Sequence, residues 1–467
     1  MRDQETRHDP GMDSQIQAWL VDTDLSPEEA GAGLARVLHE FPVTPQVRRR
    51  FFDRWLHRED GTQPTGPARG AASGSGQRHT LMLSATAATA AAVAIALVGI
   101  NIIELQPVPE TRVRELVVAA DGTGDYPTIA DAVAAARDGD TVRLQPGTYT
   151  EAVVIDKDIT LTGSGSRDEV ILTAPSRGPV RHFVDGPAEP YALALADSDA
   201  EISDLTLSGE RSTLLVDGGS PTLRNLHFLE VTEPFEGAAN TDRNALVITG
   251  GSRAIISDSR FERSGPLGVY ASDPTVVGNS FEGGSHIWGR FGDHAVITDN
   301  HIDGALTMAL WIIESGPILI EGNIITGSDA TGIDVGSKGS SAARVRNNRI
   351  VDAGTGITVR VGDGAEISGN ELVDTGIGVQ VSRFNGHIAD NQISGGNAGI
   401  VVISGGAPRI ADNVIDVGGR GIVAGSRTSP LISGNEVCGG ETGIHVSDGA
   451  TPQITANQVC ADDALKL

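Results

Sequence analysis

Four charged and three aromatic residues between positions 270 and 360 are the clearest candidates for chemistry in this chain. A carboxylate can act as a general acid or base or help to hold a cation, and an arginine can clamp a carboxylate through two hydrogen bonds. Aromatic rings exposed in a row mark either a ligand groove or a contact with another part of the chain. The charged candidates are Asp334, Arg360, Arg290 and Glu314, and the aromatic candidates are Tyr270, Trp288 and Trp311.

An asparagine that recurs at intervals of 21 to 25 residues indicates how the chain would position these groups. Each of these asparagines precedes an apolar residue by two positions, and a segment of the Gly-Ile-x-Val type often follows, as at Gly376–Val379. Alternating apolar and polar residues predict short strands, and a fixed period predicts a solenoid. We therefore predict an all-β parallel β-helix of roughly a dozen coils. The recurring residues are Asn279, Asn300, Asn323, Asn348, Asn370, Asn391, Asn413, Asn435 and Asn457.

The recurring asparagines are expected to lie at a corner of each coil. Asparagine tolerates the left-handed backbone region, so it can turn the chain between two strands. Coils of a parallel β-helix stack ~4.8 Å apart, which brings equivalent side chains within hydrogen-bonding distance. We therefore expect the side-chain amides to form a ladder that runs from coil to coil.

Aligning the Gly-Ile-x-Val strands predicts an outward column of residues on successive coils. The column contains Tyr270, Trp288, Trp311 and Asp334, and Arg360 is a diagonal neighbour of Asp334. The aromatic rings either form an open groove or are covered by an inserted loop, for which residues 230–244 are the candidate. Asp334 and Arg360 are either an ordinary surface ion pair or part of a reactive site. The sequence leaves both alternatives open.

Two smaller groups of residues suggest a calcium site and a disulfide. Asp197, Asp199 and Asp204 offer the hard oxygen ligands that calcium prefers, although acids at solvated corners have the same pattern. Cys438 and Cys460 are the two cysteines of the chain, and each follows its recurring asparagine by three residues. They would occupy the same position on adjacent coils, either as a disulfide or as two free thiols. The spacing of histidines and cysteines predicts no other metal site.

The segment Leu116–Gly163 contains Asp121-Gly-Thr-Gly-Asp125, an amphipathic stretch at Thr128–Ala136, and Pro146-Gly-Thr-Tyr-Thr-Glu151. It resembles the start of right-handed parallel β-helix proteins of the pectate-lyase-like superfamily, including pectin methylesterases, mannuronan epimerases and NosD-type proteins. The resemblance implies a right-handed solenoid over roughly residues 116–460, with a short helix that covers its N-terminal end. The catalytic motifs of pectin methylesterases and mannuronan epimerases do not occur here. No catalytic residue is therefore carried over from these families.

Residues 80–103 form 24 consecutive positions without a charge, which predicts a single transmembrane helix. Arginines precede this segment and glutamates follow it, so we expect the N-terminus to be cytoplasmic and the β-helix to be extracellular, anchored to the plasma membrane. The predicted organisation is a helical cytoplasmic segment at 1–61, a flexible linker at 62–79, the membrane span, a juxtamembrane linker at 104–115 and the β-helix at 116–467.

The formal net charge of −26 disfavours nucleic acid as a partner and favours solubility and divalent cations. Together with the resemblance, the outward aromatic column predicts a protein that binds a polysaccharide or another cell-envelope component and could process it. The alternative is a non-catalytic protein for surface display, adhesion or scaffolding. Calcium is the one cofactor that the sequence suggests. The two functions differ in whether Asp334, Arg360, Arg290 and Glu314 converge beside an open aromatic groove.

Overall fold

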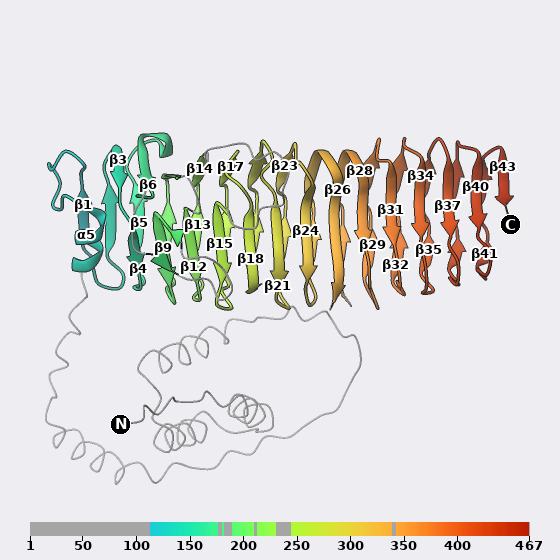
Figure 1. Ribbon diagram of the computed structural model, residues 1–467, viewed down its shortest axis with the longest axis horizontal. Helices are drawn as coiled ribbons and strands as arrows, with labels where there is room; N and C mark the ends of the chain where they lie inside the picture. Colours follow the sequence, from blue (N-terminus) through green and yellow to red (C-terminus); the bar gives the residue numbers. More distant parts are fainter. Residues whose placement is uncertain are drawn as a thin grey trace, which may run out of the picture. The chain divides into compact units, whose positions relative to one another are not determined.

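The computed structural model describes residues 113–175, 180–181, 189–209, 213–229, 244–338 and 342–466. These residues form a β-solenoid in which the strands of successive coils pair in parallel (Figure 1). The predicted parallel β-helix is therefore confirmed. Each complete coil contributes one strand to a 15-stranded sheet and two strands, called here the second and third strands of the coil, to a 26-stranded sheet.

The strands fall into three rows along the solenoid. The 15-stranded sheet consists of β1 (Glu115–Val118), β2 (Thr141–Leu144), β5 (Thr160–Gly163), β10 (Glu201–Ser203), β13 (Thr222–Arg224), β16 (Ile255–Ser257), β19 (Thr275–Val277), β22 (Val296–Thr298), β25 (Leu319–Glu321), β27 (Arg344–Arg346), β29 (Glu366–Ser368), β32 (His387–Ala389), β35 (Arg409–Ala411), β38 (Leu431–Ser433) and β41 (Gln453–Thr455). The second strands are β3 (Gly147–Thr150), β6 (Val170–Thr173), β11 (Thr206–Ser208), β14 (His227–Leu229), β17 (Arg260–Glu262), β20 (Ser280–Glu282), β23 (His301–Asp303), β30 (Glu371–Val373), β33 (Gln392–Ser394), β36 (Val414–Asp416), β39 (Glu436–Cys438) and β42 (Gln458–Cys460). The third strands are β4 (Val153–Ile155), β9 (Leu193–Ala196), β12 (Leu214–Asp217), β15 (Leu246–Thr249), β18 (Leu267–Ser272), β21 (Ile287–Phe291), β24 (Met308–Glu314), β31 (Ile377–Val381), β34 (Ala398–Val402), β37 (Arg420–Ala424), β40 (Thr442–Val446) and β43 (Asp463–Lys466).

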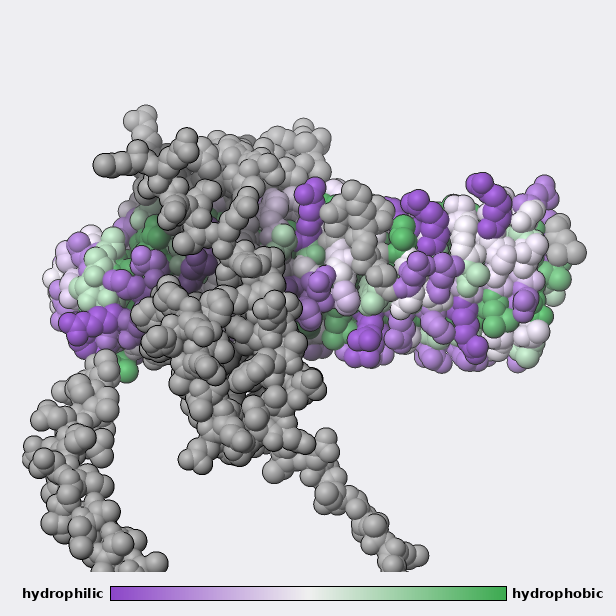
Figure 2. Space-filling view, turned by 90° about the horizontal axis from the view of Figure 1, so that it is seen from below, coloured by the Kyte–Doolittle hydropathy of each residue, from purple (hydrophilic) through white to green (hydrophobic). Residues whose placement is uncertain are grey.

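A few elements depart from this three-strand scheme. Strands β26 (Ile324–Lys338) and β28 (Arg349–Val359) each run through the second and third positions of their coil. A 3-10 helix, η1 (Arg167–Glu169), precedes β6, and β7 (Val180–Arg181) pairs antiparallel with β8 (Glu189–Pro190). On the face drawn in Figure 2, hydrophilic and hydrophobic residues are interspersed over the C-terminal coils.

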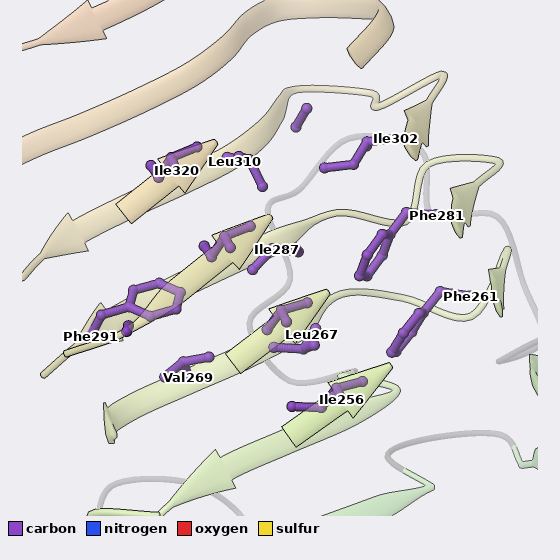
Figure 3. Close-up of a cluster of buried hydrophobic side chains, with 14 of the residues drawn as sticks. Ile256, Phe261, Leu267, Val269, Phe281, Ile287, Phe291, Ile302, Leu310 and Ile320 are labelled. Carbon is purple, nitrogen blue, oxygen red and sulfur yellow. The ribbon is translucent and has the colours of Figure 1, made fainter. Parts of the chain in front are cut away.

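The interior is filled by columns of identical or similar apolar residues. The middle residue of most short strands points inward, and Ile367, Ile388, Ile410 and Ile432 form one such fully buried column of the 15-stranded sheet. Phe228, Phe261 and Phe281 stack with centroids 4.4 Å apart in both pairs, and the last two are drawn in Figure 3. Burying one such side chain stabilises the fold by about 1.5–3 kcal/mol. The period of the sequence is therefore the period of the core.

The asparagine side chains form a buried ladder along one corner. The Oδ1 of Asn413 accepts hydrogen bonds from the backbone N–H and the Nδ2 of Asn391, at 3.1 and 2.9 Å. The same pair of bonds joins Asn391 to Asn370 and Asn435 to Asn413. The ladder runs from Asn279 to Asn457, and its Nδ2 groups also donate to backbone carbonyls of the preceding coil.

The prediction that these asparagines themselves adopt the left-handed conformation is wrong. The positive φ angle belongs to the preceding residue, as in Asp390 (φ 56°) and Asp412 (φ 57°). In four of the coils, that position is glycine, for example Gly434 (φ 72°). The reason is that the amide of each asparagine must point into the stack to reach the next coil, so the residue before it makes the sharp turn.

Helix α5 (Ile129–Ala135) lies within the predicted amphipathic stretch, at the N-terminal end of the solenoid (Figure 1). Ile129, Ala132 and Val133 are buried against the core. Its free backbone groups are satisfied by side chains: Glu151 accepts from the N–H groups of residues 129 and 130, and Lys157 donates to the carbonyls of residues 133, 134 and 136. Satisfying the ends in this way stabilises a helix of only seven residues.

The predicted cytoplasmic segment, linker and membrane span at residues 1–103, and most of the juxtamembrane linker, lie outside the described residues, as does loop 230–243. In the part of the chain that the structure describes, no helix is long and apolar enough to cross a membrane. At the C-terminal end, a disulfide joins Cys438 and Cys460, whose Cα atoms lie 4.6 Å apart on the adjacent strands β39 and β42.

Candidate functional site

The third strands carry one outward column whose register the structure defines. Gly268 pairs with Trp288, Trp288 with Trp311, and Trp311 with Asp334 on consecutive coils. The column continues through Thr358 to Gln380. One alignment made from the sequence is therefore wrong. Tyr270 pairs with Arg290 rather than with Trp288.

The tryptophans differ in exposure. Trp288 is only 7% exposed, and its Nε1 donates a hydrogen bond of 2.9 Å to Oδ1 of Asn244. Tyr270 packs on Trp288 edge-on, with centroids 5.5 Å apart, and Trp311 is tilted against Trp288 at 6.1 Å. Trp311 and Tyr270 are half-buried. Neither of the two alternatives holds for the whole row: Trp288 is enclosed, whereas Trp311 and Tyr270 are partly accessible.

An apolar cluster that the sequence analysis missed extends this column toward the N-terminus. Tyr191, Ala194, Leu215 and Val247 are all buried, although the last three occupy outward positions of β9, β12 and β15. The sequence contains a signal for it. These strands read as continuous apolar runs, such as Leu214-Leu-Val216, rather than as the alternation of a strand with one wet face.

Asn244 is the polar residue that the sequence did not single out. Its side chain lies over Gly268, where a β-carbon would come within 2.8 Å of the Asn244 Oδ1. Only glycine leaves room there for the amide that holds the indole of Trp288. Gly268 and Asn244 together fix the first ring of the column.

Asp334 and Arg360 form a bidentate pair at the other end of the column. Nη1 and Nη2 of Arg360 donate to the two carboxylate oxygens of Asp334, both at 2.6 Å. The Asp334 side chain is 0% exposed and that of Arg360 is 45% exposed. Burial raises the pKa of Asp334 above its ordinary value, and the charge and hydrogen bonds of Arg360 oppose that rise. The aspartate is therefore a buried anchor that holds an accessible guanidinium, and it pairs in register with Trp311 on the adjacent coil.

The remaining charged candidates, Arg290 and Glu314, lie on the strands that carry the two tryptophans. Arg290 is exposed, and its backbone pairs in register with Glu314 on the next coil. Because of a register shift after Gly289, Arg290 follows Trp288 by two residues whereas its partner Glu314 follows Trp311 by three. Of the described side chains in the register column itself, Asp334 is the one carboxylate. The column therefore brings Trp311, Asp334 and Arg360 together, with Arg290 at its flank.

The three aspartates considered for calcium do not converge. Asp197 and Asp199 lie in the turn before β10, whereas Asp204 lies after it at the opposite corner. Asp204 accepts a hydrogen bond of 2.7 Å from Asn225, and Asp199 accepts one from the backbone N–H of Ser220. Across residues 113–466, as far as they are described, no group of three or more His, Cys, Asp or Glu is placed to hold a metal ion. The geometry gives the calcium hypothesis no support.

Chemically, the site offers an aromatic face next to fixed hydrogen-bond donors. An indole can stack on the apolar face of a sugar ring, and a guanidinium carries five N–H donors, of which the bidentate pair with Asp334 occupies two. Asp334 has both oxygens engaged by Arg360. General acid catalysis by a carboxyl group requires a proton that the site can deliver, whereas this carboxylate is arranged as a hydrogen-bond acceptor. The arrangement is therefore suited to binding.

The family model for the right-handed β-helix region matches residues 212–352 and 332–461. These two overlapping matches cover more than half of the chain. A comparison with curated protein sequences gives no match.

Several solved structures are similar to this chain at low identity. An alginate lyase from Paenibacillus sp. str. FPU-7 is 17% identical over 60% of this chain and 94% of its own, with a TM-score of 0.38. The Yersinia enterocolitica family 28 exopolygalacturonase is 12% identical over 75% of this chain and 79% of its own, with a TM-score of 0.41. A GH87 α-1,3-glucanase from Streptomyces thermodiastaticus strain HF3-3 is 18% identical over 75% and 69%, with a TM-score of 0.40. At these identities and TM-scores the likeness carries no information on activity.

Proposed function

This chain belongs to the family of proteins with a right-handed β-helix region, and we propose that its solenoid binds a polysaccharide on the outward face around Trp311. The observation that carries the proposal is the position of Trp311. Trp311, whose side chain is half-buried, pairs in register with Asp334, and the Asp334 carboxylate holds the exposed guanidinium of Arg360. A ring face beside fixed cationic donors combines the two contacts that sugar recognition uses most, stacking and directed hydrogen bonds.

Binding without turnover is the form of the proposal that the geometry favours. Glycoside hydrolysis uses two carboxyl groups on either side of the bond that breaks. The carboxylate of the register column, Asp334, is committed to Arg360 through both oxygens. We therefore assign Trp311 and Arg360 to ligand contact, with Arg290 as a flanking contact. Asp334 is the residue that positions Arg360.

A glycan array with Trp311→Ala and Trp311→Phe tests this proposal. Wild-type protein should bind at least one class of glycan, Trp311→Ala should weaken that binding by about tenfold, and Trp311→Phe should retain most of it, because the stacking contact depends on a ring. Trp288→Ala is not a suitable test, because Trp288 is buried and its loss would damage packing.

The rival function is a non-catalytic display or scaffold protein. It is supported by the burial of Trp288 and of the outward cluster around Val247. Buried outward residues show that part of this face packs rather than binds. If no glycan on the array binds wild-type protein, or if Trp311→Ala binds as tightly as wild type, the scaffold function is the better account.

We also propose that the solenoid is displayed outside the plasma membrane by the uncharged segment 80–103. The charge asymmetry around that segment supports this orientation, and a disulfide between Cys438 and Cys460 fits an oxidising compartment. A reporter that is active only outside the cytoplasm, fused after Leu467, should be active, and the same reporter fused within residues 1–75 should be inactive. The reverse result contradicts the orientation.

A further inference from the structure

One corner of the C-terminal coils alternates arginine with glycine at equivalent positions. The turns at residues 382–386, 403–408, 425–430 and 447–452 join third strands to the next strands of the 15-stranded sheet. Four residues before each of those next strands lie, in order, Arg383, Gly405, Arg427 and Gly449. Because those strands pair in register, these four residues stack on successive coils.

The backbone at this position is left-handed in all four coils, with φ angles of 48°, 63°, 60° and 78°. Glycine adopts that conformation without strain, whereas a side chain with a β-carbon adopts it rarely. A β-carbon on Gly405 would lie 3.4 Å from the Cγ of Arg383, which is ordinary van der Waals contact, so the left-handed conformation and not a lack of space favours glycine there. The left-handed backbone favours glycine, so arginine on every second coil carries a conformational cost. Such a cost at a defined position points to a function.

The charges around this corner are locally positive although the whole chain carries −26. In the three turns at 382–386, 403–408 and 425–430, Arg383 and Arg427 are the charged residues, and both are exposed. Among the described residues, neither forms an ion pair. His387 and Arg409, which begin the following strands, are exposed as well.

Acids flank this positive stretch on both sides. Asp363, on the preceding turn, accepts a hydrogen bond of 2.6 Å from Asn385, and Asp448 lies exposed on the following turn. The positive stretch is thus bounded, and it adjoins the Trp311 site, since the hydroxyl of Ser382 donates a hydrogen bond of 3.1 Å to the backbone carbonyl of Arg360.

We propose that this corner, defined by Arg383 and Arg427, binds a linear acidic polysaccharide. The two arginines are two coils apart, about 10 Å along the solenoid axis. That distance is close to the length of two sugar residues in an extended chain, so the surface fits a polymer with a negative group on every second sugar. The hydroxyl groups of Ser382, Ser404 and Ser426 line the same turns and provide neutral hydrogen-bond partners for the sugars between the charges. This surface does not depend on the function proposed for Trp311.

The test is biolayer interferometry of full-length protein on four immobilised probes. These are hyaluronan, with a carboxylate on every second sugar; polygalacturonate, with one on every sugar; neutral dextran; and inorganic polyphosphate. The variant is Arg383→Gln with Arg427→Gln. The matched control is Arg137→Gln with Arg253→Gln, which removes the same charge from exposed arginines elsewhere on the solenoid. Thermal melts establish that each variant is folded.

Wild-type protein should bind hyaluronan more tightly than polygalacturonate, and binding should weaken steeply as salt rises from about 50 mM, since exposed charges are screened. The Arg383/Arg427 variant should bind hyaluronan about tenfold more weakly, while the control variant and Trp311→Ala stay within about twofold of wild type. The proposal is overturned if neither acidic polysaccharide binds, if only polyphosphate binds, if the Arg383/Arg427 variant binds like wild type, or if the control variant loses as much. Tighter binding of polygalacturonate than of hyaluronan would refute the spacing argument. Loss of binding in Trp311→Ala alone would place the polymer at the other site.

Discussion

Replacing Asn413 with alanine should destabilise the solenoid more than any exposed asparagine can, because Asn413 is a fully buried rung of the ladder. Its Oδ1 accepts from the backbone N–H of Asn391 at 3.1 Å, and its Nδ2 donates to the carbonyl of Ile388 at 2.9 Å and to Oδ1 of Asn435 at 2.9 Å. Alanine removes all of these bonds from a site with 0% exposure.

The magnitude follows from which groups lose their partner. Oδ1 of Asn435 still accepts from the backbone N–H of residue 413, and Nδ2 of Asn391 still donates to the carbonyl of Ile367. The backbone N–H of Asn391 is left without its acceptor in a site with 0% exposure. One such orphaned donor costs about 1–3 kcal/mol, and the lost amide hydrogen bonds add roughly 1 kcal/mol. The free energy of unfolding should therefore fall by about 2–4 kcal/mol.

Urea unfolding followed by far-ultraviolet circular dichroism measures the change. Two matched substitutions define the scale. Asn397→Ala, at an exposed corner, should change the free energy by no more than about 0.5 kcal/mol. Asn457→Ala, at the half-buried last rung, should fall between the two, because water can reach the groups it exposes. If Asn413→Ala is no more destabilising than Asn397→Ala, the buried hydrogen bonds of the ladder do not stabilise the fold.

Three further predictions concern the charged and covalent contacts. Arg360→Gln should lower the free energy of unfolding by about 3 kcal/mol at pH 8, because it leaves the buried Asp334 carboxylate uncompensated. This loss should shrink toward pH 4, because burial raises the pKa of Asp334 and the carboxylate then takes up a proton. Melts at both pH values, made on the single variant and on Arg360→Gln with Asp334→Asn, check this. An equal loss of stability at both pH values would contradict it. Asp140→Asn should flatten the acid limb of the stability curve: hydrogen bonds from Arg114 lower the pKa of Asp140 from 3.8 to about 2, so its contribution is present above 3.8 and is lost as the pH falls through 2. Acid titration of melting temperature tests this, and an unchanged slope below pH 4 would refute it. Cys438→Ser should cost about 2–4 kcal/mol under oxidising conditions and nothing under reducing ones, as measured by urea unfolding with and without a reductant.

Much of the fold could be predicted because each coil repeats one local pattern. From Asn279 onward, the inward residues of the short strands recur with the asparagine, so the sequence by itself determined the solenoid, the parallel pairing and the identity of the ladder residues. It also placed Trp288, Trp311 and Asp334 on successive coils, since their strands start with the same apolar pattern. A periodic core needs only nearest-neighbour contacts, and these are written in consecutive repeats.

Register in the irregular coils was decided only by the tertiary structure. Strand β18 contains Gly268-Val-Tyr270, which resembles the Gly-Ile-x-Val start. In the structure, however, Leu267 pairs with Ile287 because both enter the core, and this puts Gly268 rather than Tyr270 beside Trp288. The length of each turn changes the count by one or two residues, so a motif alone does not give the alignment. The left-handed conformation likewise belongs to the residue before each asparagine and not to the asparagine itself, because the amide of each asparagine must face the stack.

Burial on the outward face was likewise decided by the tertiary structure. Trp288 and Trp311 are equivalent in sequence pattern, yet Trp288 is enclosed and held by Asn244, which is 44 residues away along the chain. Asp334 and Arg360 were neighbours by alignment, but the two-fold hydrogen bonding and the complete burial of the carboxylate depend on the side chains of adjacent coils. The sequence determined which side chains point outward, because the strand period is two. Which of them meet water was decided by contacts between residues far apart in the chain, and a repeat does not encode such contacts.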